Sequence, residues 1–236
     1  MSRPLLRPRL RPLAGVILAA ALALPAAHSA PPPSPAQAVA AGTLLVLNVR
    51  QETVSQGTGF AIDSRRTVVT NNHVIRQPGK LYVAAPGGHL IPARLLTADA
   101  RLDLALLRAT APVPKLAPGD ARDVHVGEAV AAAGYPRQLS RDRLFAHLRP
   151  VTTTGVIAGL KDRGREIDGR PLVLLRTTAA VQPGNSGGPL YRRKTGEVIG
   201  VMVSGLAINK RLTSVTFAIP INEVYGLQSR HTEIRR

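Results

Sequence analysis

The sequence predicts an all-β fold, built either as a pair of barrels or as a sandwich. Short β-like runs follow one another closely, about six in each half of the chain, with turn residues between them. No long helical period separates the two sets. Hydrophobic residues make up 44% of the 236 residues and charged residues 19%, which is typical of a globular chain and excludes a largely disordered one.

The expected strands are spread over both halves of the chain. In the first half they cover residues 43–50, 57–63, 67–71, 80–85, 90–98 and 104–108. In the second half they cover residues 129–134, 151–159, 171–177, 188–191, 198–204 and 214–219. Turn sequences such as QPG at 77–79 and PGD at 118–120 separate them. After the last strand, a short helix is expected from Asn222, with Asn222 as its N-cap.

The first 29 residues have the three parts of a secretory signal peptide. Four arginines give a basic start, residues 13–24 form an apolar run of 12, and small residues lead up to Ser29. We therefore expect export and cleavage near Ser29, which removes the four arginines and lowers the formal net charge from +17 to +13. A retained membrane anchor is the alternative, but a spanning helix needs about 20 apolar residues.

Residues 30–42, which read APPPSPAQAVAAG, are rich in Pro and Ala and are expected to form a linker. The chain contains no cysteine, which excludes a disulfide scaffold, a thiolate metal site and a cysteine nucleophile. An exported chain that is stable without disulfides points to the periplasm or the exterior of a bacterium.

The strongest chemical signal is the segment VQPGNSGGPL at residues 181–190, where Ser186 lies among three glycines. Gly184 can adopt a backbone conformation that turns its N–H inward. The N–H groups of Gly184 and Ser186 would then point at one place beside the Ser186 hydroxyl. Such a pair is an oxyanion hole, and each donor is typically worth ~3–4 kcal/mol of the barrier. The alternative is a plain Gly-rich turn with an incidental serine.

A nucleophilic serine needs a base, and the base needs an acid that orients it. His73 follows a β-like run in the segment TNNHVI, and Asp103 lies among apolar residues in RLDLALL. A buried aspartate is costly unless it is paired, and pairing with a histidine ring would remove that cost. Taken alone, His73 reads as a capped or core histidine and Asp103 as a turn acid. Together with Ser186 they supply all three residue types of a catalytic triad.

The order His73, Asp103, Ser186 resembles that of the chymotrypsin-like serine proteases and differs from the orders in subtilisins and α/β-hydrolases. The details are most similar to the bacterial HtrA/Deg type. GTGF at 57–60, TNNHVI at 70–75, LDLALL at 102–107, PGNSGGPL at 183–190 and FAIP at 217–220 resemble that family's motifs. The resemblance covers about residues 43–228.

This resemblance implies two six-stranded antiparallel β-barrels, about 43–120 and 121–228, with the active site in the cleft between them and a short C-terminal helix. Residues 229–236 would form a basic tail. By the same resemblance, His73 is the general base, Asp103 orients it, and Ser186 is the nucleophile. The oxyanion hole would be formed by the N–H groups of Gly184 and Ser186. The implied activity is that of a secreted serine endopeptidase that hydrolyses unfolded or exposed protein segments through an acyl-enzyme.

The resemblance also places the substrate pocket. The residue six positions before the nucleophile lies at the base of the pocket in this family, and here it is Ala180. Met202, Val203 and Ser204 would line the wall. No carboxylate is expected at the base, so we predict cleavage after small or medium aliphatic residues such as Val or Ala.

Two departures from the family pattern stand out. The chain ends at Arg236, soon after FAIP, whereas HtrA proteins typically continue into PDZ modules, so no PDZ domain is expected. Residues Arg137 to Arg149 form a basic insertion with apolar residues at helical spacing. A weak contact with anionic surfaces is one interpretation of this insertion. A solvated, lightly packed loop is the interpretation we favour.

The alternative function is a catalytically inactive homologue that binds clients as a chaperone-like module. Nucleic-acid binding is not expected, because the positive charge lacks interleaved aromatic residues. The remaining histidines show no ligand spacing, so no metal or other cofactor is expected. Family members often form trimers, which makes a homo-oligomer a further expectation.

Overall fold

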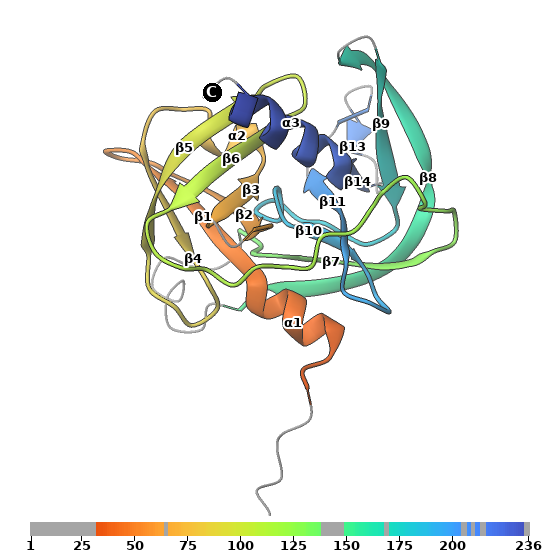
Figure 1. Cartoon of the computed structure of the whole chain (residues 1–236), viewed down its shortest axis with the longest axis horizontal. Coiled ribbons are helices and arrows are strands. Elements are labelled where there is room, and N and C mark those ends of the chain that lie inside the picture. Colours follow the sequence, from red (N-terminus) through yellow and green to blue (C-terminus); the bar gives the residue numbers. More distant parts are fainter. Residues whose placement is uncertain are drawn as a thin grey trace, which may run out of the picture. The chain divides into compact units, whose positions relative to one another are not determined.

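The computed structural model describes residues 32–63, 66–137, 149–167, 170–203, 207–208, 211–212 and 216–233. Its strands form two closed barrels of six strands each, together with a small sheet of β12 (Ala207–Ile208) and β13 (Arg211–Leu212) (Figure 1). The all-β fold with two six-stranded barrels is thus confirmed, and the sandwich alternative is excluded. The predicted signal peptide, residues 1–29, lies outside the described residues.

The first barrel is built from β1 (Thr43–Val49), β2 (Val54–Ala61), β3 (Thr67–Thr70), β4 (Lys80–Ala84), β5 (Ile91–Asp99) and β6 (Leu104–Ala109). Its strands pair in the order β1-β2-β3-β6-β5-β4, and β4 closes the barrel on β1. Successive side chains of a strand point in opposite directions. Leu44 and Val46 of β1 therefore pack inside this barrel, whereas Leu45 and Leu47 pack with Tyr135, which follows the first strand of the second barrel.

The second barrel is built from β7 (Ala129–Gly134), β8 (Val151–Ile167), β9 (Arg170–Thr177), β10 (Pro189–Arg192), β11 (Val198–Val203) and β14 (Thr216–Pro220). Its strands pair in the order β10-β11-β14-β9-β8-β7. The interior is filled by small and branched side chains such as Val130, Ile157 and Ile199. β8 is longer than the sequence pattern indicates, because its pairing with β9 continues past residue 159 as far as Ile167.

The structure differs from the predicted linker over residues 30–42, because Pro35–Gly42 form helix α1. Ser34 and Gln37 make a reciprocal capping box: the Gln37 N–H donates to Ser34 Oγ at 3.3 Å, and the Ser34 N–H donates to Gln37 Oε1 at 2.8 Å. Val39 of this helix is buried in the hydrophobic core together with Leu116. The capping box and the burial of Val39 stabilise this helix, although the Pro- and Ala-rich composition of the segment is typical of a linker.

The C-terminal helix α3 (Ile221–Glu233) crosses strands of both barrels, contacting β5 of the first and β11 and β14 of the second (Figure 1). Asn222 lies inside its first turn and is not its N-cap, contrary to the sequence prediction. The Asn222 side chain instead accepts the Ala121 N–H at 2.9 Å and donates to Asp120 at 3.0 Å. None of the helices described here has the length and apolar character needed to cross a bilayer.

Tyr135 joins the two barrels. It is fully buried, and its hydroxyl donates to the Thr43 carbonyl oxygen at the start of β1 at 3.1 Å. Its own carbonyl oxygen accepts a hydrogen bond from the Gln56 side chain of β2 at 3.1 Å. Burial raises the pKa of the Tyr135 phenol well above its usual value. The neutral phenol is therefore the form that stabilises the fold.

We expect Tyr135→Phe to lower the free energy of unfolding by about 1 kcal/mol at neutral pH, because the Thr43 carbonyl loses its partner. The folded-state pKa is raised, so this stabilisation is present below the unfolded-state pKa of about 10 and is lost as the pH rises above it. The difference in stability between wild type and variant should therefore shrink above pH 10. Urea unfolding between pH 7 and 11 measures it, and a difference that stays constant would contradict the assignment.

Candidate active site

His73 and Asp103 are brought together by the pairing of two adjacent strands. β3 ends at Thr70, opposite Ala105 in β6, so the residues after β3 lie beside those before β6. His73 lies in the short helix α2 (Asn72–Ile75), and Asp103 directly precedes β6. The Asn71 side-chain amide donates to the Asp103 carbonyl oxygen at 2.9 Å and fastens the two segments together.

The Asp103 carboxylate binds His73 through both of its oxygens. Oδ2 lies 2.8 Å from His73 Nδ1, and Oδ1 accepts the His73 backbone N–H at 2.9 Å. An ionised carboxylate only accepts hydrogen bonds, so Nδ1 is the donor and Nε2 is the ring nitrogen left to take a proton. The side chain of His73 is 38% exposed and that of Asp103 is 17% exposed. The ring is therefore accessible, while the acid behind it is sheltered.

Asp103 has a left-handed backbone conformation, with φ of 59°. This conformation is uncommon for a residue with a side chain, although aspartate tolerates it better than most. The Asn72 N–H donates to the Asp103 carbonyl oxygen at 3.1 Å, in addition to the bond from Asn71. The bonds from Asn71 and Asn72 thus hold Asp103 in the backbone conformation that presents both carboxylate oxygens to His73.

Ser186 lies in the loop before β10 and is 3% exposed. Its carbonyl oxygen accepts the Thr58 N–H of β2 at 2.8 Å. The next residue, Gly187, has φ of 88°, and a Cβ added there would collide with the Thr58 carbonyl oxygen and lie 3.0 Å from the Asn71 N atom. The loop with Ser186 therefore passes directly against the segment that leads into α2. The structure thus gathers the segments of His73, Asp103 and Ser186 around β2.

The backbone on either side of Ser186 has a defined orientation. The Pro183 carbonyl oxygen accepts the Arg137 N–H at 2.8 Å, and the Asn185 carbonyl oxygen accepts the Gly188 N–H at 3.0 Å. In a trans peptide the N–H points away from the preceding carbonyl oxygen. The N–H groups of Gly184 and Ser186 are therefore directed away from these two contacts, and the Gly184 N–H has no acceptor among the described residues.

The predicted pocket residues have different environments. Ala180 is exposed, and its carbonyl oxygen accepts the Thr153 hydroxyl at 2.8 Å. Met202 and Val203 are buried in β11, with Met202 inside the core of the second barrel. Both backbone groups of Met202 bond the loop of residues 183–188, here called the nucleophile loop because Ser186 is the proposed nucleophile. The Met202 carbonyl oxygen accepts the Gly187 N–H at 2.9 Å, and its N–H donates to the Gly188 carbonyl oxygen at 2.8 Å. Ser204 lies outside the described residues.

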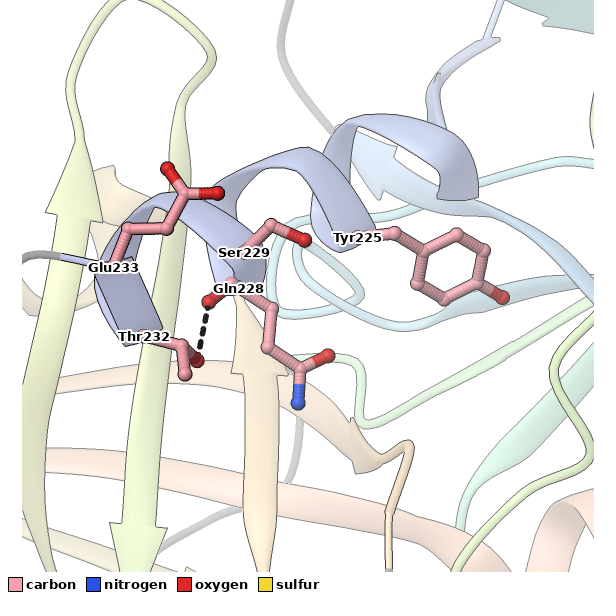
Figure 2. A pocket seen from close by; sticks show the side chains of 5 residues that line it. All are labelled: Tyr225, Gln228, Ser229, Thr232 and Glu233. Carbon is pink, nitrogen blue, oxygen red and sulfur yellow. Dashed lines mark hydrogen bonds between the residues drawn. The ribbon is translucent and has the colours of Figure 1, made fainter. Parts of the chain in front are cut away.

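A hollow lies along α3 and contains none of the predicted site residues. Figure 2 shows its lining side chains, which are Tyr225, Gln228, Ser229, Thr232 and Glu233. The Thr232 hydroxyl donates to the Gln228 carbonyl oxygen at 3.0 Å, and the Tyr225 hydroxyl donates to the Gly119 carbonyl oxygen at 3.0 Å. Both hydroxyls are thus used in hydrogen bonds to the backbone. His73, Asp103 and Ser186 therefore remain the candidate site. No cluster of metal-ligating side chains occurs in the part of the chain that is described.

Sequence reasoning missed three contributors to this site. Asn71 binds the backbone of Asp103, Arg137 holds the peptide before Gly184, and the Thr58 hydroxyl donates to the Gly184 carbonyl oxygen at 2.7 Å. Thr58 lies within the GTGF motif, which carried the family resemblance but indicated no role for its hydroxyl. Arg137 lies at the start of the basic insertion, of which residues 138–148 are outside the described residues.

The arrangement of histidine, aspartate and a glycine-flanked serine on two β-barrels has counterparts among known proteins. The family model described as a trypsin-like peptidase domain matches residues 57–201. The chain belongs to this family. The relatives and solved structures that it resembles are Do-like, DegP-like and HtrA-type proteases, which is the resemblance that the motifs at residues 57–60 and 183–190 indicated.

Among curated relatives, Protease Do-like 1, chloroplastic, from Arabidopsis thaliana is 37% identical over 193 residues. The match covers 78% of this chain and 40% of that protein. A probable periplasmic serine endoprotease, DegP-like, from Brucella suis is 37% identical over 171 residues, covering 71% of this chain and 31% of that protein. The chain thus spans less than half the length of these relatives.

Solved structures give the same assignment. The HtrA-type protease AlgW with a tripeptide superimposes with a TM-score of 0.69 at 25% identity, covering 84% of this chain and 63% of that one. A serine endoprotease from Yersinia pestis gives a TM-score of 0.67 at 28% identity, covering 88% of this chain and 70% of that one. The two-barrel architecture of this chain is therefore that of the HtrA proteases.

We expect Gly187→Ala to be markedly destabilising, and Gly127→Ala is the matched control. Both glycines have similar positive φ values, 88° and 87°, but a Cβ on Gly127 meets nothing within 4 Å. The control should cost about 1–2 kcal/mol from backbone strain alone. Gly187→Ala should cost about 1–3 kcal/mol more, because the methyl group collides with the Thr58 carbonyl oxygen and the Thr70 hydroxyl.

Urea unfolding of the two alanine variants beside wild type measures this difference in the free energy of unfolding. Equal losses for the two variants would mean that the nucleophile loop is not packed against β2 and β3 as described.

Proposed function

We propose that this protein is a serine endopeptidase that works through an acyl-enzyme. Ser186 is the nucleophile, His73 is the general base, and Asp103 orients His73. The observation that carries the proposal is the 2.8 Å contact between His73 Nδ1 and Asp103 Oδ2, which fixes the ring and leaves Nε2 to accept a proton. The position of the Ser186 loop against the segment entering α2 supports it.

In the first step, Ser186 Oγ attacks the carbonyl carbon of the scissile bond and its proton passes to His73 Nε2. The negative charge that develops on the carbonyl oxygen is stabilised by the N–H groups of Gly184 and Ser186. His73 then gives its proton to the departing amine, and the acyl group stays on Ser186. A water molecule attacks the acyl carbon, His73 takes up the water's proton, and the serine is released with that proton restored.

The proposed substrates are unfolded or exposed segments of proteins, which enter the site as extended chains. Ala180 is exposed and carries no charge that would select a basic side chain. We therefore propose a preference for small or medium aliphatic residues, such as Val or Ala, before the cut. Val203 and Ser204 remain the proposed wall of this pocket, together with the backbone of Met202.

We further propose that the protein works in the periplasm or outside a bacterial cell, after removal of its signal peptide near Ser29. The relatives from Brucella and other bacteria are named periplasmic serine endoproteases, which supports this location. Assembly into a homotrimer is a proposal that rests on the family resemblance. A weak contact of residues 137–149 with anionic surfaces is the alternative to the solvated loop that we favour.

Ser186→Ala should lower casein turnover by about 10⁴-fold or more, because the nucleophile is lost. Asp103→Asn should lower it by about 10⁴-fold, because the amide favours the wrong tautomer of His73. Turnover is measured by release of soluble peptides, and a fluorophosphonate probe should label wild type but not Ser186→Ala. Wild-type protein that is folded but neither cleaves casein nor takes up the probe would instead support the alternative, a chaperone-like module that binds clients.

Mass spectrometry of the casein products tests the pocket. Wild type should cut mainly after Val and Ala, because the base of the pocket is formed by Ala180. Ala180→Asp should add cuts after Lys and Arg, since the new carboxylate would attract a cationic side chain, whereas Ala180→Asn should not. Cuts chiefly after Lys or Arg by wild type would show that the pocket is assigned to the wrong residues.

A further inference from the structure

Thr58 uses every one of its polar groups to join separate parts of the site. It is fully buried in β2. Its N–H donates to the Ser186 carbonyl oxygen at 2.8 Å, and its hydroxyl donates to the Gly184 carbonyl oxygen at 2.7 Å. The same hydroxyl accepts the Tyr135 N–H at 3.0 Å, and the Thr58 carbonyl oxygen accepts the Thr70 hydroxyl at 2.8 Å.

The hydroxyl of Thr58 and the backbone of Arg137 together hold both peptide planes that flank Gly184. The Arg137 N–H binds the Pro183 carbonyl oxygen, which orients the peptide that carries the Gly184 N–H. The Thr58 hydroxyl binds the Gly184 carbonyl oxygen and so orients the next peptide. Gly184 has φ of 102°, and these contacts, together with the Asn185 N–H bond to the Gln182 carbonyl oxygen at 3.0 Å, select that conformation from the wide range open to a glycine.

We propose that the Thr58 hydroxyl is a positioning group for catalysis: it holds the backbone at Gly184 so that the oxyanion donors face the substrate. This inference rests on the proposed peptidase activity. Thr58 acts through Gly184 and Ser186 and does not touch the substrate. Its effect should therefore be on the stabilisation of the transition state rather than on the binding of the peptide.

The hydroxyl, and not only the shape of the side chain, is required by this arrangement. Valine has the same branched shape as threonine and suits a strand equally well. In Thr58→Val, however, the Gly184 carbonyl oxygen and the Tyr135 N–H would both lose their partner at a fully buried position. The peptide between Gly184 and Asn185 would then keep the bond from the Asn185 N–H to the Gln182 carbonyl oxygen but lose the bond on its own carbonyl oxygen. A change in its orientation would shift the two adjoining peptides, which carry the N–H groups of Gly184 and Ser186.

The test compares Thr58→Val with Thr58→Ser and with Thr43→Val. Serine restores the hydroxyl. Thr43→Val is the matched control, because Thr43 is also fully buried in the first barrel and its hydroxyl donates to the Val39 carbonyl oxygen at 2.8 Å, away from the nucleophile loop. The kcat and KM are measured on a peptide anilide whose sequence comes from a mapped casein cut. The melting temperature of each variant is measured alongside.

Thr58→Val should lower kcat by about 10- to 100-fold while KM stays within about 2-fold of wild type. Thr58→Ser should keep kcat within about 3-fold of wild type, and Thr43→Val should do the same although it also loses a buried hydrogen bond. If Thr58→Val does not fold, Thr58→Cys replaces it. Its thiol is a weak donor, so kcat should again fall while KM is preserved.

The proposal is overturned if folded Thr58→Val or Thr58→Cys has the kcat of Thr43→Val, or if Thr58→Ser fails to restore a kcat lost in Thr58→Val. A rise in KM with unchanged kcat would also overturn it, since it would place Thr58 in substrate binding. Failure of the proposed peptidase activity itself looks different: folded wild-type protein would then neither cleave casein nor react with the fluorophosphonate probe.

Discussion

The candidate site depends on the double contact between the Asp103 carboxylate and His73. One oxygen binds the imidazole and the other binds the backbone of the same residue, so both the ring and the helix that carries it are fixed. This contact needs Asp103 in its left-handed conformation, which in turn needs the bonds from Asn71 and Asn72. The pairing of β3 with β6 supplies that geometry. A shift in this register would separate His73 from Asp103.

Ser186, the proposed nucleophile, belongs to the other barrel, so the candidate site also depends on how the two barrels join. Thr58, in the first barrel, binds the backbone on both sides of Asn185, and Tyr135 binds the first barrel in return. These bonds are buried, and buried polar groups are costly unless they are paired. The residues that hold the barrels together are therefore the ones that place Ser186 against α2. The same buried hydrogen bonds therefore stabilise the contact between the barrels and set the geometry of the candidate site.

Much of this structure could be predicted from the sequence. The strands were predictable because short apolar runs separated by turn residues are typical of β-strands. The order of His73, Asp103 and Ser186 predicted a catalytic triad, and the structure places His73 against Asp103. Helix α1 was not predicted, because the Pro- and Ala-rich composition indicated a linker and the capping pair of Ser34 and Gln37 was not recognised. The role of Thr58 was not predictable either. It depends on partners 77 and 126 residues away, which only the assembled barrels bring into contact.

The nucleophile loop is ordered without the help of a charge. Its backbone is held by neutral hydrogen bonds from β2, from β11 and from Arg137 N–H, while Asn185 between them is 4% exposed and uncharged. The Asn185 side chain packs against Gly134, and its oxygen has no hydrogen-bond partner among the described residues. A carboxylate at this position would need a buried cation to offset the loss of its hydration. With asparagine, the loop reaches its conformation through backbone contacts that the folded barrels already supply, so no new ion pair is required to order it.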